Sequence, residues 1–149
     1  MHVLSSFMDK SVVDYDDPAN WSIDNEYFNR HPLITRAHFP IDRSGSRKVT
    51  YRLVDPERML TTAEVLEGIG KIEFFKLRRP NLAETRVFHQ KFPKWWADKP
   101  VLSLCGACHE QGGPPFIAYA QGEGERFNLF FNWMGFKLMP SGVILAIAE

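Results

Sequence analysis

The segment Cys105-Gly106-Ala107-Cys108-His109 brings together the residue types of a haem or metal site. Two cysteines three positions apart, followed at once by a histidine, form the pattern of covalent c-type haem attachment, in which the thiols bond to the haem vinyl groups and the imidazole ligates iron. Met139, which stands before Pro140, is the candidate for the sixth iron ligand. Against haem, about a hundred residues precede the motif, and strand-like rather than helical sequence follows it.

Zinc is the second cofactor that this segment could bind, since thiolate and imidazole groups are preferred zinc ligands. Cys105 and Cys108 would supply two ligands of a tetrahedral site, His109 a third and His89 the fourth. The sequence contains no second closely spaced ligand pair, which strong zinc signatures have. The remaining interpretation makes both cysteines small buried residues at the end of a strand, with the histidine on a turn and no cofactor. We adopt this interpretation and keep zinc and haem c as alternatives.

The aromatic residues point to a different role, which is protein binding. They make up 13% of the chain, and rings at this density must fill a core or a surface that a partner covers. Residues 1–48 are rich in turn formers and show no sustained helical or alternating period. We expect them to form an extended, loop-rich arm that docks on a protein partner. The candidate contact residues are Trp21, Tyr27, Phe28, Trp95 and Trp96.

Charge is balanced over the whole chain but unevenly distributed along it. Residues 1–29 hold six acids and one Lys, residues 30–99 hold fifteen Lys or Arg and eight acids, and residues 100–149 hold two bases and four acids. An acidic segment can fold back on the basic middle and weaken its field, and no nucleic-acid recognition motif accompanies the charge. Nucleic acid is therefore not an expected partner.

The first residues lack the basic start and apolar run of a secretory signal, and two cysteines this close together cannot form a long-loop disulfide framework. We expect an intracellular, cytoplasmic protein. The segment of residues 129–148 is long and apolar enough to span a membrane, but it includes Asn132, Lys137, Pro140 and Gly142. A pair of buried strands joined by a turn at Pro140 explains this segment better, so no membrane span is expected.

The strongest local signal is the capping box Thr61-Thr62-Ala63-Glu64, in which the Thr hydroxyl and the Glu carboxylate each accept from the other residue's backbone N–H. It predicts a helix that begins at Thr62 and ends at Gly68 or Gly70. Asn81 followed by Glu84 repeats the pattern and predicts a second helix that runs to about Phe92.

Alternating and β-branched residues predict strands around these helices. The predicted strands are residues 49–54, 71–77, 101–104, 116–120, 127–131 and 143–147. This pattern predicts an α+β fold, in which a mixed or antiparallel sheet carries two short helices on one face and a long loop-rich N-terminal arm. The chain would then divide into the arm, residues 1–48, and a single α+β domain, residues 49–149.

Two functions remain open at this point. The favoured one is a non-catalytic protein-interaction protein, either a small subunit or an accessory or inhibitory factor of a larger assembly, because the sequence contains no complete catalytic set. The alternative is a metal- or haem-binding protein that uses Cys105, Cys108 and His109. Elemental analysis and a visible spectrum of the purified protein distinguish the two.

Overall fold

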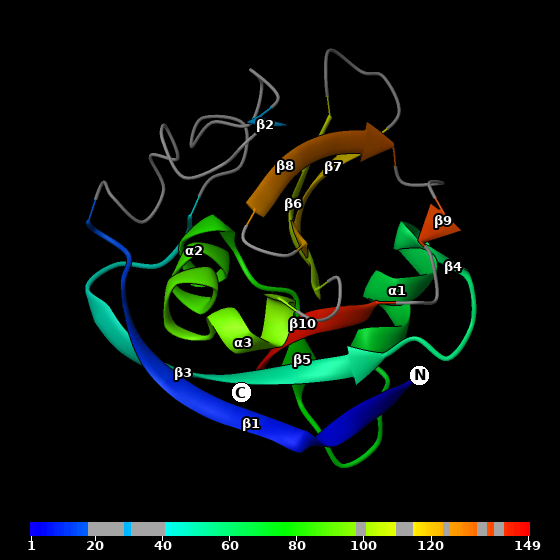
Figure 1. Ribbon diagram of the computed structural model, residues 1–149, viewed down its shortest axis with the longest axis horizontal. Helices are drawn as coiled ribbons and strands as arrows, with labels where there is room; N and C mark the ends of the chain where they lie inside the picture. The colour runs from blue at the N-terminus through cyan, green and yellow to red at the C-terminus, as the bar shows by residue number, and fades with distance from the viewer. Residues whose placement is uncertain are drawn as a thin grey trace.

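The computed structural model describes residues 1–17, 29–30, 41–97, 101–109, 115–123, 126–133, 137–138 and 142–149. These residues form a mixed sheet with helices packed on it, which confirms the predicted α+β class (Figure 1). The helices are α1 (Thr62–Ile69), α2 (Leu82–Lys91) and α3 (Pro93–Ala97). The strands are β1 (His2–Asp14), β2 (Asn29–Arg30), β3 (Ser46–Asp55), β4 (Leu60–Thr61), β5 (Leu77–Arg78), β6 (Val101–His109), β7 (Pro115–Glu123), β8 (Arg126–Trp133), β9 (Lys137–Leu138) and β10 (Val143–Ala148).

The main sheet has the strand order β1-β3-β10-β6-β7-β8-β2, and β5 pairs with β10 beside this path. Neighbouring strands are antiparallel, except that β10 runs parallel to β6 and β2 runs parallel to β8. The short strands β4 and β9 pair with each other in a second sheet. Residues 129–148 therefore do contain strands, but β8 and β10 are separated in the sheet by β6 and β7, so the expectation that they pair with each other is wrong.

The central strand β10 is apolar throughout because both of its faces are covered. Val143, Leu145 and Ile147 belong to the core cluster that contains α2, whereas Ile144 and Ala146 belong to the cluster that contains α1. Successive side chains of a strand point to opposite faces, so α1 and α2 pack on opposite faces of the sheet. The expectation that both helices lie on one face is therefore wrong. The sequence of a helix shows which of its side chains are apolar, but it does not show which face of the sheet they cover.

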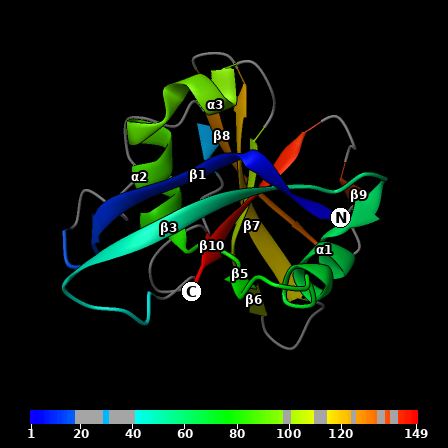
Figure 2. The same cartoon turned by 90° about the horizontal axis from the view of Figure 1, so that it is seen from below.

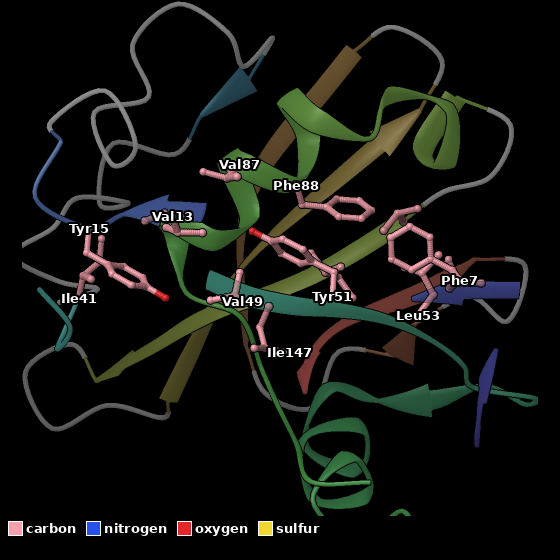
Figure 3. Packing of buried hydrophobic residues seen from close by; sticks show 14 residues of the cluster. Phe7, Val13, Tyr15, Ile41, Val49, Tyr51, Leu53, Val87, Phe88 and Ile147 are labelled. Atoms are coloured by element: carbon pink, nitrogen blue, oxygen red, sulfur yellow. The ribbon is translucent and has the colours of Figure 1, made fainter. Parts of the chain in front are cut away.

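Helix α2 lies with α3 inside the curve of the sheet, between β1 and β3 at one end and β6, β7 and β8 at the other (Figure 1). Every side chain of α2 from Leu82 to His89 is buried. The ring of Phe88 packs edge-on against Phe7, with centroids 6.0 Å apart, and at a tilt against Tyr51, with centroids 5.5 Å apart (Figure 3). None of the three described helices has the length and apolar character needed to cross a membrane.

Both predicted helix starts are confirmed. The Thr61 hydroxyl accepts from Glu64 N at 3.1 Å, and Glu64 Oε1 accepts from Thr61 N at 3.1 Å; this helix ends at Gly70. At the start of α2, Asn81 Oδ1 accepts from Glu84 N and Glu84 Oε1 accepts from Asn81 N, each at 2.9 Å. These caps need only residues within one helical turn, which is why the sequence alone reveals them.

The beginning of the predicted loop-rich arm differs from expectation, since residues 2–14 form β1. Phe7 and Val13 of this strand are buried in the core. The register of β1 against β3 shifts between Val3 and Met8, which breaks the period-two pattern that would have revealed a strand. Residues 18–28 and 31–40 lie outside the described residues, so docking of the arm on a partner stays a prediction.

Candidate protein-interaction site

The Cys-x-x-Cys-His segment lies in β6 and not in a turn. Gly106 pairs with Ala118, Cys108 with Phe116 and His109 with Pro115, and the register shifts beside Cys105, which is buried. An extended strand places residues three apart at about 10 Å between Cα atoms, whereas a disulfide spans about 4.4–6.8 Å and a Cys-x-x-Cys chelate needs a turn. The strand conformation therefore does not favour joint ligation by the two thiols.

The other candidate ligands give the motif no further support. His89 is 4% exposed on α2, and burial lowers its pKa to about 3, so its imidazole is neutral. Met139 lies outside the described residues. Within the described ranges, no group of three or more His, Cys, Asp and Glu residues could hold a metal ion. The zinc and haem hypotheses stay predictions.

The structure describes only part of the predicted contact set. Trp21, Tyr27 and Phe28 lie outside the described residues, and the side chain of Trp96 is likewise not described. Trp95 is half-buried, and its ring packs against Phe7 at 4.7 Å between centroids. Trp95 thus covers one end of the core beside α2, and an interaction role for it stays a prediction.

A buried ionic network fixes the segment between β5 and α2. The Glu84 carboxylate is fully buried and accepts from Arg78 Nη1 at 2.8 Å, Arg78 Nη2 at 2.7 Å and the Tyr15 hydroxyl at 2.7 Å. Burial lowers the pKa of Arg78, but hydrogen bonds and charge from Glu84 and Glu149 more than offset this effect and raise it. Burial, and then Glu84, raises the pKa of Tyr15. The guanidinium of Arg78 is therefore permanently charged and rigidly placed.

Beside this network is a pocket of about 440 Å³, which we call the Arg79 pocket. Its lining residues are Leu66, Ile69, Gly70, Leu77, Arg78 and Arg79. Arg78 is committed to Glu84 and Glu149, whereas Arg79 forms no ion pair in the described part of the chain. The pocket thus combines aliphatic side chains with one guanidinium whose charge the described residues leave uncompensated.

Between α1 and β5, residues 70–76 form turns and irregular chain, so the predicted strand over residues 71–77 is reduced to β5. The turn starts where Gly68 O accepts from Lys71 N at 3.0 Å. Ile72 and Phe75 pack partly buried against the α1-side core, and the Phe75 ring lies 4.9 Å from the Arg52 guanidinium. Of the two residues between these anchors, Phe74 has φ of 67° and is 98% exposed.

Phe74 is the interaction candidate that the sequence interpretation missed. A bulky residue with positive φ is an outlier, which the surrounding structure must impose, and full exposure of its ring recovers no burial energy. The available signal was the Phe74-Phe75 pair itself, because adjacent residues of a strand cannot both face one core. Backbone positions held in rare conformations occur often at functional sites, so Phe74 is a candidate contact residue.

Comparison with known proteins does not assign the chain to a family: no family model, curated protein or solved structure matches it.

Proposed function

We propose that this chain is a non-catalytic binding protein, a small subunit or an accessory or inhibitory factor, that docks a protein partner on Phe74 and the Arg79 pocket. The observation that carries the proposal is Phe74, an aromatic ring that is 98% exposed on a backbone with positive φ. A left-handed conformation costs roughly 1–2 kcal/mol for a residue with a Cβ, so this placement lowers the stability of the isolated protein. Strained backbone positions cluster at functional sites, which supports a binding role for Phe74.

Phe74 belongs to the segment of residues 71–79, whose charged residues bear on the chemistry of the partner. Lys71 pairs with Glu67 at 2.5 Å, whereas Glu73, Lys76 and Arg79 form no ion pair in the described ranges, so two cations and one acid are left along this segment. Arg79 also lines the aliphatic pocket. The partner segment that complements this site carries a large apolar side chain for the pocket and a carboxylate close to it for the guanidinium.

Selection from a phage-displayed library of random peptides tests the proposal with a defined probe. Wild-type protein is expected to enrich peptides in which an acidic residue lies within a few positions of a large apolar one. Phe74→Ser and Arg79→Gln should each weaken binding of these peptides roughly tenfold or more. Met59→Ser is the matched control, because Met59 is also exposed, at 49%, and lies outside the site.

Folding of the variants is a built-in check. Phe74 buries almost nothing, so Phe74→Ser should unfold at the same urea concentration as wild type or a higher one. The proposal is wrong if no peptide is enriched, or if the enriched peptides bind Phe74→Ser and Arg79→Gln as tightly as wild type.

A further inference from the structure

The outer face of β1 and β3 extends beyond the helix that packs on it. On this side of the sheet, the core cluster around α1 reaches Val3 of β1 and Val54 of β3. Figure 2 shows both strands from this side, with α1 beside the start of β1 and the end of β3. Further along β1, the side chains of Met8 and Val12 are 61% and 59% exposed. Helix α1 thus covers one end of this face and leaves the other end to solvent.

The register of β1 against β3 determines which side chains lie together at the uncovered end. Directly opposed residues of neighbouring strands share a face, and so do residues two apart along one strand. Since Val54 faces α1, the even-numbered residues of β3 before it lie on the same side. With their partners in β1 they form the outer patch, which consists of Met8 opposite Arg52, Lys10 opposite Thr50, and Val12 opposite Lys48.

The outer patch is cationic. Lys10 and Lys48 are exposed and pair with no acid among the described residues. They are diagonal neighbours across the two strands, about 7–8 Å apart at the backbone, so their charges repel each other. Asp14 comes next in the same series of β1, and its carboxylate accepts from Asp16 N at 3.0 Å. Three cations and this one acid leave an excess of two positive charges at the uncovered end.

Apolar side chains lie beside these cations, since Met8 is opposite Arg52 and Val12 is opposite Lys48. The guanidinium of Arg52 is already held in place, because its Nη2 donates to Leu4 O at 3.4 Å and the centre of the Phe75 ring lies 4.9 Å away. The two lysines are therefore the cations left for a partner to neutralise. Met8 and Val12 are the apolar side chains left for it to bury.

We infer that the outer patch docks an amphipathic α-helix of a protein partner. Its apolar stripe would cover Met8 and Val12, and Asp or Glu residues beside the stripe would pair with Lys10 and Lys48. Met8 and Val12 are four residues apart on an extended strand, which is about 13 Å, and helical residues seven or eight apart span about 10–12 Å. A helix of three turns therefore reaches both.

Two further arguments favour an acidic helix as the occupant. Helices α1 and α2 already cover other parts of this sheet, and packing a helix on a sheet is a standard way to bury its face. A second copy of the outer patch would bring the same cations together, so docking of two copies face to face is disfavoured. The outer patch shares no residue with Phe74 or the Arg79 pocket, and the inference does not rest on the proposed function.

Selection from a phage-displayed library, in which one face of a helical scaffold is randomised, tests the inference. Wild-type protein is expected to enrich helices with an apolar stripe bordered by Asp or Glu. The double variant Lys10→Glu/Lys48→Glu should weaken binding of these helices roughly tenfold or more, and Lys in place of the helix acids should restore binding to this variant. The double variant Lys91→Glu/Lys94→Glu is the matched control, because it makes the same charge change at exposed residues of α2 and α3.

Thermal unfolding checks that the variants remain folded. Both lysines of the outer patch are exposed, so the melting temperature of the double variant should stay close to that of wild type. The enriched helices should bind Phe74→Ser and Arg79→Gln as tightly as wild type. Loss of binding in those two variants instead would place the helices at the Arg79 pocket, which overturns this inference and leaves the proposed function standing.

Other anionic partners are tested with defined probes. These are vesicles that contain phosphatidylserine and a single-stranded DNA oligonucleotide. The inference is overturned if no helix is enriched, if the charge-exchanged helices fail to bind the double variant, or if only the vesicles or the oligonucleotide bind in a way that depends on Lys10 and Lys48.

Discussion

Replacement of Glu84 by Gln tests whether the buried ionic network stabilises the packing of α2 against β5 and the end of β1. The Glu84 carboxylate has no exposed surface and accepts four hydrogen bonds, from the Tyr15 hydroxyl, both Nη atoms of Arg78 and the backbone N of Asn81. Gln has the same shape and can still complete the capping box, so the helix start is retained. The change removes the charge and places an amide donor opposite one Nη of Arg78, which is itself a donor.

The expected cost follows from the burial of the two partners. Removing one member of a buried ion pair costs about 3–5 kcal/mol because the other charge is left uncompensated. Arg78 is 24% exposed and keeps its interaction with Glu149, which is 48% exposed. We therefore expect the lower end of that range, about 3 kcal/mol, for Glu84→Gln. For a chain of this length the melting temperature should fall by about 6–12 °C.

Urea denaturation of matched variants measures this loss. Glu149→Gln removes the exposed partner of the same guanidinium and should cost under about 1 kcal/mol, as surface ion pairs do. Tyr15→Phe deletes one hydrogen bond to the carboxylate and should cost about 1 kcal/mol. A Glu84→Gln variant no less stable than Glu149→Gln would show that burial does not make Glu84 the more important partner.

Three further predictions concern the other sites. The pKa of His89 is about 3 in the folded protein and about 6.5 in the unfolded chain, so below pH 6.5 the unfolded chain binds a proton that the folded protein does not. The free energy of unfolding should therefore fall by about 1 kcal/mol between pH 6.5 and 5.5. The variant His89→Gln should largely lack this loss. Thr61→Ala should cost about 1 kcal/mol in urea denaturation, and Glu64→Ala less, because the hydroxyl satisfies a donor at the start of α1; two neutral results would contradict this role. The zinc and haem hypotheses predict that Cys108→Ser lowers the melting temperature far more than loss of a buried thiol would; an unchanged melting temperature, with no metal or Soret band in wild type, would exclude both.

Much of the secondary structure was accessible from the sequence because its causes are local. The caps at Thr61 and Asn81 each depend on a residue three positions away. The apolar run of β10 indicated a buried strand, since a strand covered on both faces needs apolar residues throughout. By contrast, β1 escaped prediction because its register shift interrupts the alternation.

The binding surfaces depend on contacts between distant parts of the chain. Phe74 is exposed because Ile72 and Phe75 are anchored on either side of it, and the anchoring of Phe75 involves Arg52, a residue of β3. The outer patch is exposed because α1 covers only the other end of the face that β1 and β3 share. Neither the exposure of Phe74 nor that of the outer patch can be deduced from the local sequence of these residues.

Glu84 shows most directly what local sequence and tertiary structure each determine. Its role as the third helical residue of a capping box follows from Asn81 alone, because the two residues are joined by one turn of helix. Its burial and its pairing with Tyr15 and Arg78 arise only when β1 and β5 are brought to α2 by the order of strands in the sheet. The sequence by itself determined where α1 and α2 begin and that β10 is a buried strand, because these features depend on residues close together in the chain. Only the tertiary structure decided which side chains and charges remain exposed to a partner. Burial, hydrogen bonds and ion pairs between segments distant in the sequence determine which groups are left on the surface.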